Sequence, residues 1–137
     1  NYWVKVLVKF KYLTFEEVMD AYEFIIDNTG GDKGLINQGN LEFTLSHIID
    51  YDFGETDHEK KLIRKSSFLV WNIIDSHPFT DGNKRAGLHC LLTFLSINSY
   101  YLDADQDELF EFTLKTALKE FGFEEVNKFI ENHLKHE

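Results

Sequence analysis

The sequence has few of the residues that interrupt or cross-link a chain. Among its 137 residues there are one proline, Pro78, one cysteine, Cys90, and eight glycines. A single cysteine excludes an internal disulfide and a cysteine-based zinc site, and it is typical of a reducing compartment. Because chain breakers are so scarce, a mostly helical protein is expected.

Long apolar stretches are missing as well. A membrane-spanning helix needs about 20 apolar residues in a row, and the longest candidates, residues 3–8 and 91–95, are shorter or interrupted by charge. Residues 3–9 also show no cleavage-site pattern, so they do not resemble a signal peptide. We therefore expect a cytoplasmic protein that does not bind a membrane.

Positive charge is in short supply. Lysine and arginine total 14 against 24 aspartates and glutamates, which gives a net charge of −10. Nucleic-acid binding depends on many contacts between cations and phosphates, so direct nucleic-acid binding is not expected. Any phosphate that this protein binds must be held by a local cation cluster against the overall field.

Apolar and aromatic residues are plentiful. They include 13 Phe, 6 Tyr and 2 Trp, and apolar residues make up 43% of the chain. This composition excludes a disordered tail or linker, and the length suits one domain.

The periodicity of apolar residues predicts an all-α fold. Residues 2–10 alternate between apolar and polar side chains, which indicates a short N-terminal strand or arm over residues 1–11. Helical spacing and capping residues follow, so residues 12–137 are expected to form one compact bundle of five to six helices.

The first expected helix begins at the capping box Thr14–Glu17, has Tyr22 on its apolar face and stops at Gly30-Gly31, and residues 31–40 are expected to form a loop. A short helix is expected from residue 41 to about 50, and a longer one from the cap at residues 56–59 to a point before Pro78. The next begins near Asn83 and is apolar to residue 97, another runs from the cap at residues 105–108 through Phe121, and the last covers residues 123–133.

One segment concentrates chemical groups between two apolar helices: His77-Pro78-Phe79-Thr80-Asp81-Gly82-Asn83-Lys84-Arg85. The proline and glycine place residues 83–85 in the first turn of a helix, where free amides and the helix dipole favour a phosphate. Lys84 and Arg85 add full charges, Asp81 is a hard ligand suited to magnesium, and His77 can accept a proton near neutral pH. The alternative is a capped loop in which His77 bonds a backbone carbonyl and Asp81 or Asn83 only caps the helix.

The same nine residues resemble the signature of the Fic/Doc superfamily, in which Fic members carry a pattern like HPFx(D/E)GNGR. Lys84 stands where Fic enzymes have glycine, and this feature is similar to the death-on-curing (Doc) toxin branch. Residues 12–14, 30–35, 40–42 and 107–109 also look Doc-like. One departure is Ala86, where Doc proteins often have threonine.

The resemblance implies a role for each matching position. His77 would be the general base and Asp81 the magnesium ligand. Asn83 would orient a phosphate or the catalytic loop, Arg85 would bind phosphate, and Phe79 would anchor the loop. Gly82 and Lys84 would belong to the nucleotide-binding turn.

The implied activity is that of a Doc-like toxin from a toxin–antitoxin pair of a bacterium or archaeon. Such a toxin would use ATP and magnesium to transfer the γ-phosphate to a Ser or Thr hydroxyl of a translation factor similar to elongation factor Tu. The alternatives are a Fic-type enzyme that transfers AMP to a protein hydroxyl and an inactive binding module.

Other candidate sites have weaker patterns. His133 and His136 are spaced like metal ligands, but a frayed, solvated end is the preferred interpretation, and Cys90 is interpreted as a buried thiol. The Fic self-inhibitory motif, (S/T)xxxE(G/N), is most nearly matched by residues 116–121, which fail at the last position. Control by a separate antitoxin protein is therefore expected.

Overall fold

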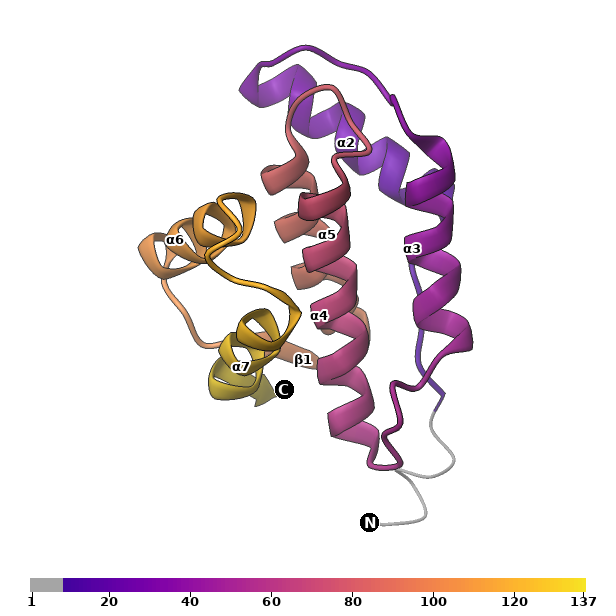
Figure 1. Cartoon of the computed structure of the whole chain (residues 1–137), viewed down its shortest axis with the longest axis vertical. Coiled ribbons are helices and arrows are strands. Elements are labelled where there is room, and N and C mark those ends of the chain that lie inside the picture. The colour runs from indigo at the N-terminus through magenta and orange to yellow at the C-terminus, as the bar shows by residue number, and fades with distance from the viewer. Residues whose placement is uncertain (1–8) are drawn as a thin grey trace.

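The computed structural model describes residues 9–137, and its regular elements are almost all helical (Figure 1). The expectation of an all-α bundle of five to six helices is confirmed, with a two-stranded sheet added. The elements are α2 (Phe15–Thr29), α3 (Gln38–Asp50), α4 (His58–Ser76), α5 (Asn83–Ile97), β1 (Tyr100–Leu102), α6 (Gln106–Ala117), α7 (Phe123–His133) and β2 (Leu134–His136).

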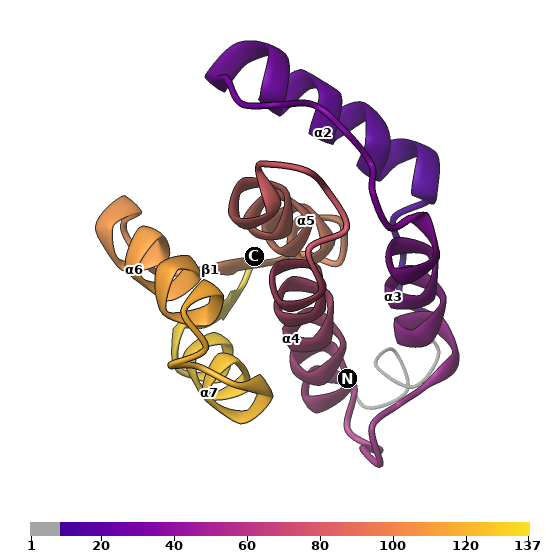
Figure 2. The ribbon, with the colours of Figure 1, turned by 45° about the horizontal axis from the view of Figure 1, so that its top comes forward.

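Helices α4 and α5 form the centre of the molecule. Figure 2 shows α2 and α3 on one side of this pair and α6 and α7 on the other. The two central helices contribute side chains that are fully shielded from water: Leu62, Leu69, Val70, Ile73, Leu91, Phe94 and Leu95. Burial of each such side chain contributes about 1.5–3 kcal/mol, so the two helices that carry the 77–85 segment are anchored in the core.

Local capping signals fix most helix ends. Thr14 and Asp105 each form the expected capping box, with Glu17 and Glu108 respectively. Helix α4 begins after Asp57, whose side chain accepts a hydrogen bond from the Lys60 amide. These helices therefore begin where the sequence predicts.

Helix α3 begins earlier than expected. The sequence placed residues 31–40 in a loop, whereas α3 begins at Gln38. The reason is the Asn37 side chain, which accepts a hydrogen bond from the Asn40 amide at 3.0 Å and caps the helix. This cap outweighs the low helix propensity of Gly39.

The C-terminal region differs from the sequence prediction in two ways. Helix α6 ends at Ala117 rather than Phe121, and Lys119 has a positive φ of 62°. The chain end is not frayed, because β2 pairs antiparallel with β1, and the rings of His136 and Tyr100 lie 4.7 Å apart. The ring of His133 is also engaged, 3.2 Å from a Glu108 carboxylate oxygen.

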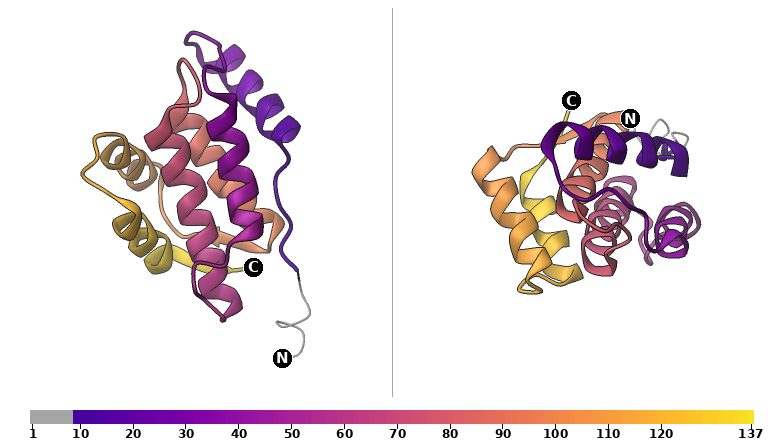
Figure 3. Two further views of the ribbon diagram at one scale, coloured as in Figure 1. Left: turned by 45° about the vertical axis from the view of Figure 1, so that its right-hand side comes forward. Right: turned by 90° about the horizontal axis from the view of Figure 1, so that it is seen from above.

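The predicted N-terminal strand falls mainly on residues 1–8, which lie outside the described residues. Residues 9–14 have no regular secondary structure and extend away from the α4–α5 link (Figure 3). They are fixed by Asn98 at the end of α5, whose side chain bonds both the amide and the carbonyl of Lys11. Between residues 9 and 137, no helix is both long and apolar enough to cross a membrane.

Candidate active site

The link between α4 and α5 carries the residues singled out by the sequence. Helix α4 ends at Ser76, and His77 follows in the left-handed region with φ 50° and ψ 62°. Gly82 also has a positive φ, 82°, and α5 begins at the next residue. Two left-handed residues therefore turn the chain between antiparallel helices, and the segment in between forms a tight loop.

Asn83 holds this loop together. Its side-chain oxygen accepts a hydrogen bond from the Phe79 amide at 3.0 Å, and its side-chain nitrogen donates to the Phe79 carbonyl at 2.9 Å. Both residues are buried, and Phe79 is only 1% exposed. The Asn83 side chain therefore fixes the backbone of the loop at Phe79.

The α2–α3 link lies across the outer side of the loop, as Figure 1 shows at the top of the molecule. Thr80 donates a backbone hydrogen bond to Gly34, and the amides of Ile36 and Asn37 both donate to the Pro78 carbonyl. These bonds join two segments that are more than 40 residues apart in the sequence. Sequence reasoning assigned residues 31–40 only to a loop and missed this contact.

Asp81 and Arg85 are engaged with the same region. The Arg85 guanidinium donates hydrogen bonds to the Thr29 hydroxyl and, at 2.8 Å, to the Gly30 carbonyl, at the C-terminal end of α2. It also lies 3.7 Å from the Asp81 carboxylate. Asp81 in turn accepts from the amides of Gly82, at 2.8 Å, and Asp32, at 3.3 Å.

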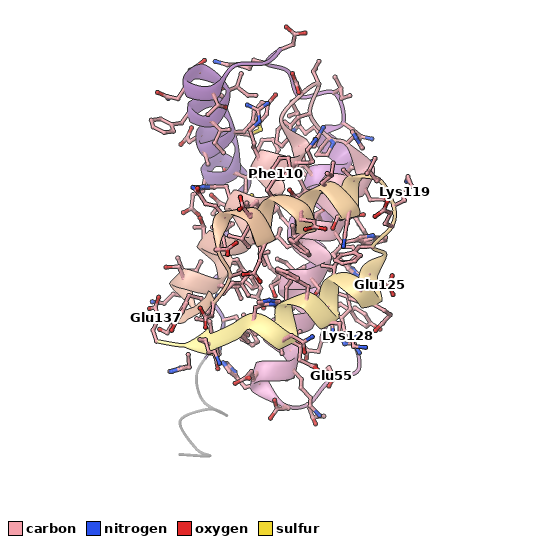
Figure 4. All side chains as sticks on the ribbon, turned by 90° about the vertical axis from the view of Figure 1, so that its left-hand side faces the viewer. Glu55, Phe110, Lys119, Glu125, Lys128 and Glu137 are labelled. Atoms are coloured by element: carbon pink, nitrogen blue, oxygen red, sulfur yellow. The ribbon has the colours of Figure 1, made fainter. Side chains whose placement is uncertain are left out.

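Two cavities meet at the first turn of α5. The smaller, about 300 Å³, is lined by groups from the loop, including His77, Asp81 and Lys84, and by Ala117 of α6. The larger, about 660 Å³, lies between α5 and α6 and has an apolar lining that includes Leu88 and Phe110. Figure 4 shows Phe110 on α6 and Lys119 just past the end of that helix. Lys84 and Arg85 line both cavities.

The first turn of α5 suits an anion. Its N-terminal cap, Gly82, has no side chain that could cover the free amides, and the turn contains no acidic residue. Lysine and arginine in this turn oppose the helix dipole, and a bound anion would offset that repulsion. The structure therefore brings the predicted phosphate-binding residues to the rim of one cavity.

His77 also lines the smaller cavity. Its side chain is exposed, and its Nδ1 lies 3.3 Å from the backbone oxygen of Asp75. If that nitrogen carries the proton, Nε2 is left as the acceptor, which is the form a general base requires. The Asp75 carboxylate pairs with Lys119 at 2.9 Å, so the α6–α7 link supports the turn that carries His77.

Asp81 is the carboxylate of the 77–85 loop that could hold a magnesium ion. Among residues 9–137, no three His, Cys, Asp or Glu side chains gather in a group that could hold a metal. Magnesium commonly binds through one or two carboxylates together with substrate phosphates and waters. The half-exposed Asp81 carboxylate, beside the phosphate-binding turn, matches that pattern.

Cys90 takes no part in this site. It is 1% exposed on the buried side of α5, and burial raises the pKa of its thiol to about 12. The thiolate is therefore not populated at neutral pH. The interpretation of Cys90 as a buried thiol is confirmed.

Comparison with protein families agrees with the geometry. Residues 12–95, more than half of the chain, match the Fic/DOC family. The chain belongs to this family. No curated protein sequence matches the chain. The matched region runs from the segment before α2 through most of α5, so it includes the whole 77–85 loop and the link that covers it. Fic/DOC proteins generally transfer nucleotide or phosphate groups to proteins, which identifies the activity class as protein-modifying transfer.

A glycine in the α2–α3 link provides a test of this packing. Gly31 has a φ of +112°, and a Cβ there would lie 2.7 Å from a carboxylate oxygen of Asp81. We expect Gly31→Ala to lower the free energy of unfolding by more than about 1 kcal/mol and to weaken binding of Mg-ATP, because Asp81 is displaced. Urea unfolding and calorimetric titration would measure the two effects.

Gly30→Ala is the matched control for Gly31→Ala. Gly30 also has a positive φ, +90°, but a Cβ there would meet nothing within 4 Å. The Gly30→Ala variant should therefore have a lower free energy of unfolding because of backbone strain, but it should bind Mg-ATP as tightly as the parent. Equal losses of binding in the two variants would contradict a role for the contact between Gly31 and Asp81.

Proposed function

We propose that this protein is a Doc-like kinase toxin, which transfers the γ-phosphate of ATP to a Ser or Thr hydroxyl of a translation factor similar to elongation factor Tu. The proposal includes a bacterial or archaeal cytoplasm as its location and a separate antitoxin as its control. The observation that carries it is the position of Lys84, whose side chain lines both cavities at the start of α5.

The loop residues would divide the reaction among them. Nε2 of His77 would remove the proton from the substrate hydroxyl, whose oxygen then bonds to the γ-phosphorus as the bond to the β–γ bridging oxygen breaks. The amides of the first turn of α5, with Lys84 and Arg85, would hold the triphosphate in line with that hydroxyl. Magnesium, held by Asp81, would neutralise phosphate charge.

Lys84 favours the kinase over the AMP transferase. A glycine at this position would leave room for phosphates to settle against the helix amides, so that the α-phosphate would face His77. The lysine stem and ammonium would take up that space, and the nucleotide would then present its γ-phosphate instead. Because phosphoryl transfer depends mainly on positioning and charge neutralisation, nucleotide orientation alone could select the product.

The AMP transferase remains the second candidate, because AMP transfer is the activity of the Fic enzymes that the loop otherwise resembles. The kinase and the AMP transferase are distinguished by incubating the protein with a bacterial lysate and ATP labelled at either the α- or the γ-phosphate. The kinase proposal expects protein labelling from the γ-position only. Labelling from the α-position would replace it with AMP transfer, and labelling from neither would favour a binding module.

Lys84→Gly tests the argument from orientation. We expect this variant to transfer less γ-phosphate and to begin transferring AMP, measured with the same two labelled nucleotides. Lys84→Met is the matched control, because it keeps a long side chain and removes only the charge, so it should keep transferring the γ-phosphate. If Lys84→Gly transfers the same group at the parent's rate, Lys84 does not select the product.

Control by an antitoxin is proposed because this chain offers a poor inhibitor of its own. Residues 116–121 depart from the self-inhibitory motif, and their Glu120 is exposed beyond the end of α6. The Thr116 hydroxyl is buried and donates to the Phe112 carbonyl at 2.8 Å. A partner segment that folds onto the surface near the site would supply the missing control.

A further inference from the structure

Tyr22 of α2 is buried against the 77–85 loop and makes two contacts with it and one with the α2–α3 link. Its side chain is 1% exposed. Its ring stacks on that of Phe79, with centroids 3.7 Å apart and planes 9° from parallel. Its hydroxyl donates to the backbone carbonyl of Asp81 at 2.9 Å and accepts from the Gly34 amide at 3.3 Å.

This hydroxyl joins the two segments that form the site. A tyrosine hydroxyl has one proton to donate, and the short contact assigns that proton to the Asp81 carbonyl. The Gly34 amide belongs to the α2–α3 link, whose Asp32 amide also bonds the Asp81 carboxylate. Asp81 is thus held at its backbone by Tyr22 and at its side chain by the link that Tyr22 also holds.

We infer that Tyr22 is a positioning residue, whose hydroxyl fixes the backbone of Asp81 and thereby the direction of the carboxylate that would hold magnesium. This inference rests on the proposed function for the part played by magnesium. The contacts themselves belong to the fold and can be tested without any transfer reaction.

Tyr22→Phe removes the hydroxyl and keeps the ring that stacks on Phe79. We expect the magnesium concentration for half-maximal transfer to rise about tenfold, the effect of losing one hydrogen bond of ordinary strength. Transfer at saturating magnesium should return close to the parent rate. A variant that was only less stable would lose activity at every magnesium concentration and would not shift the half-maximum.

Tyr100→Phe is the matched control. Tyr100 is 5% exposed, and its hydroxyl donates to a Glu59 carboxylate oxygen at 3.5 Å. It lies in β1, beyond the far end of α5, about 20 Å from the loop along a helix of this length. Its magnesium half-maximum should equal that of the parent.

Hydrogen exchange gives a readout that does not depend on activity. In Tyr22→Phe, the amides of Gly34 and Gly82 should exchange faster than in the parent, while amides in the middle of α4 should be unchanged. Unchanged exchange at both glycines would overturn the inference. So would faster exchange with no shift of the magnesium half-maximum, because Tyr22 would then order the loop without positioning Asp81.

The two proposals fail in different ways. If the parent protein transfers neither phosphate nor AMP to any protein, the proposed function is wrong, and the exchange rates still decide whether Tyr22 holds the Asp81 segment. If the parent transfers phosphate and Tyr22→Phe matches it in exchange and in magnesium dependence, only the inference about Tyr22 is wrong.

Discussion

Replacing His77 by alanine is expected to lower the rate of transfer by ~10²–10⁴-fold, the usual contribution of a positioned general base. We expect the variant to lose transfer rate but to keep its affinity for nucleotide, because His77 follows α4 and is not part of the phosphate-binding first turn of α5. Transfer of label from ATP to protein would measure the first effect, and calorimetric titration with Mg-ATP the second.

The backbone at His77 requires a careful choice of variants. His77 has a φ of 50°, and asparagine tolerates this left-handed conformation better than alanine does. His77→Asn should therefore keep the loop geometry and still lose transfer. His89→Ala, which removes an exposed histidine from the side of α5, should transfer at the parent rate. If His77→Asn transfers as fast as the parent, His77 is not the base.

Replacing Lys65 by methionine is expected to lower the free energy of unfolding by about 3 kcal/mol, because it leaves one buried and one partly buried carbonyl acceptor without their donor. Lys65 is 1% exposed. Its ammonium donates to the carbonyls of Ile48 and Tyr51 at the end of α3 and lies 3.3 Å from an Asp52 carboxylate oxygen. Urea unfolding would measure the loss.

Lys60→Met is the matched control for Lys65→Met, because Lys60 is exposed on the same helix. A change at the surface should alter the free energy of unfolding by no more than about 0.5 kcal/mol. Buried charges can sometimes be replaced by apolar residues without loss. If Lys65→Met is as stable as Lys60→Met, the ammonium does not secure the end of α3.

The sequence predicts the parts of the fold that depend on neighbouring residues. The capping boxes at Thr14 and Asp105 and the end of α4 before Pro78 are determined within a few residues, and all are found as expected. The pairing of β1 with β2 was not predicted. These strands are too short to show a period of two, and their partners are more than 30 residues apart.

The candidate site also has a part that the sequence predicts and a part that it does not. Its chemically active side chains lie in one nine-residue segment, so the sequence alone brings them together. The groups that hold this segment, Tyr22 and the α2–α3 link, come from distant positions. From the sequence, Tyr22 is predicted only to lie on the apolar face of α2, and Gly30-Gly31 only to end that helix. One glycine, Gly30, is enough to end the helix. The second glycine, Gly31, is the sequence signal that indicates a close contact at that position.

The most direct test of the account is to titrate the ¹⁵N-labelled full chain with Mg-ATP and follow its backbone amides by nuclear magnetic resonance. The largest chemical-shift changes are expected at the amides of residues 82–85, at the start of α5. Adenosine, which lacks phosphates, should leave these amides unchanged, and the amide of Lys65, about three turns before the end of α4, should not respond to either ligand. Saturation with Mg-ATP that shifts amides elsewhere and leaves residues 82–85 unmoved would contradict the claim that this turn holds the phosphates of the nucleotide.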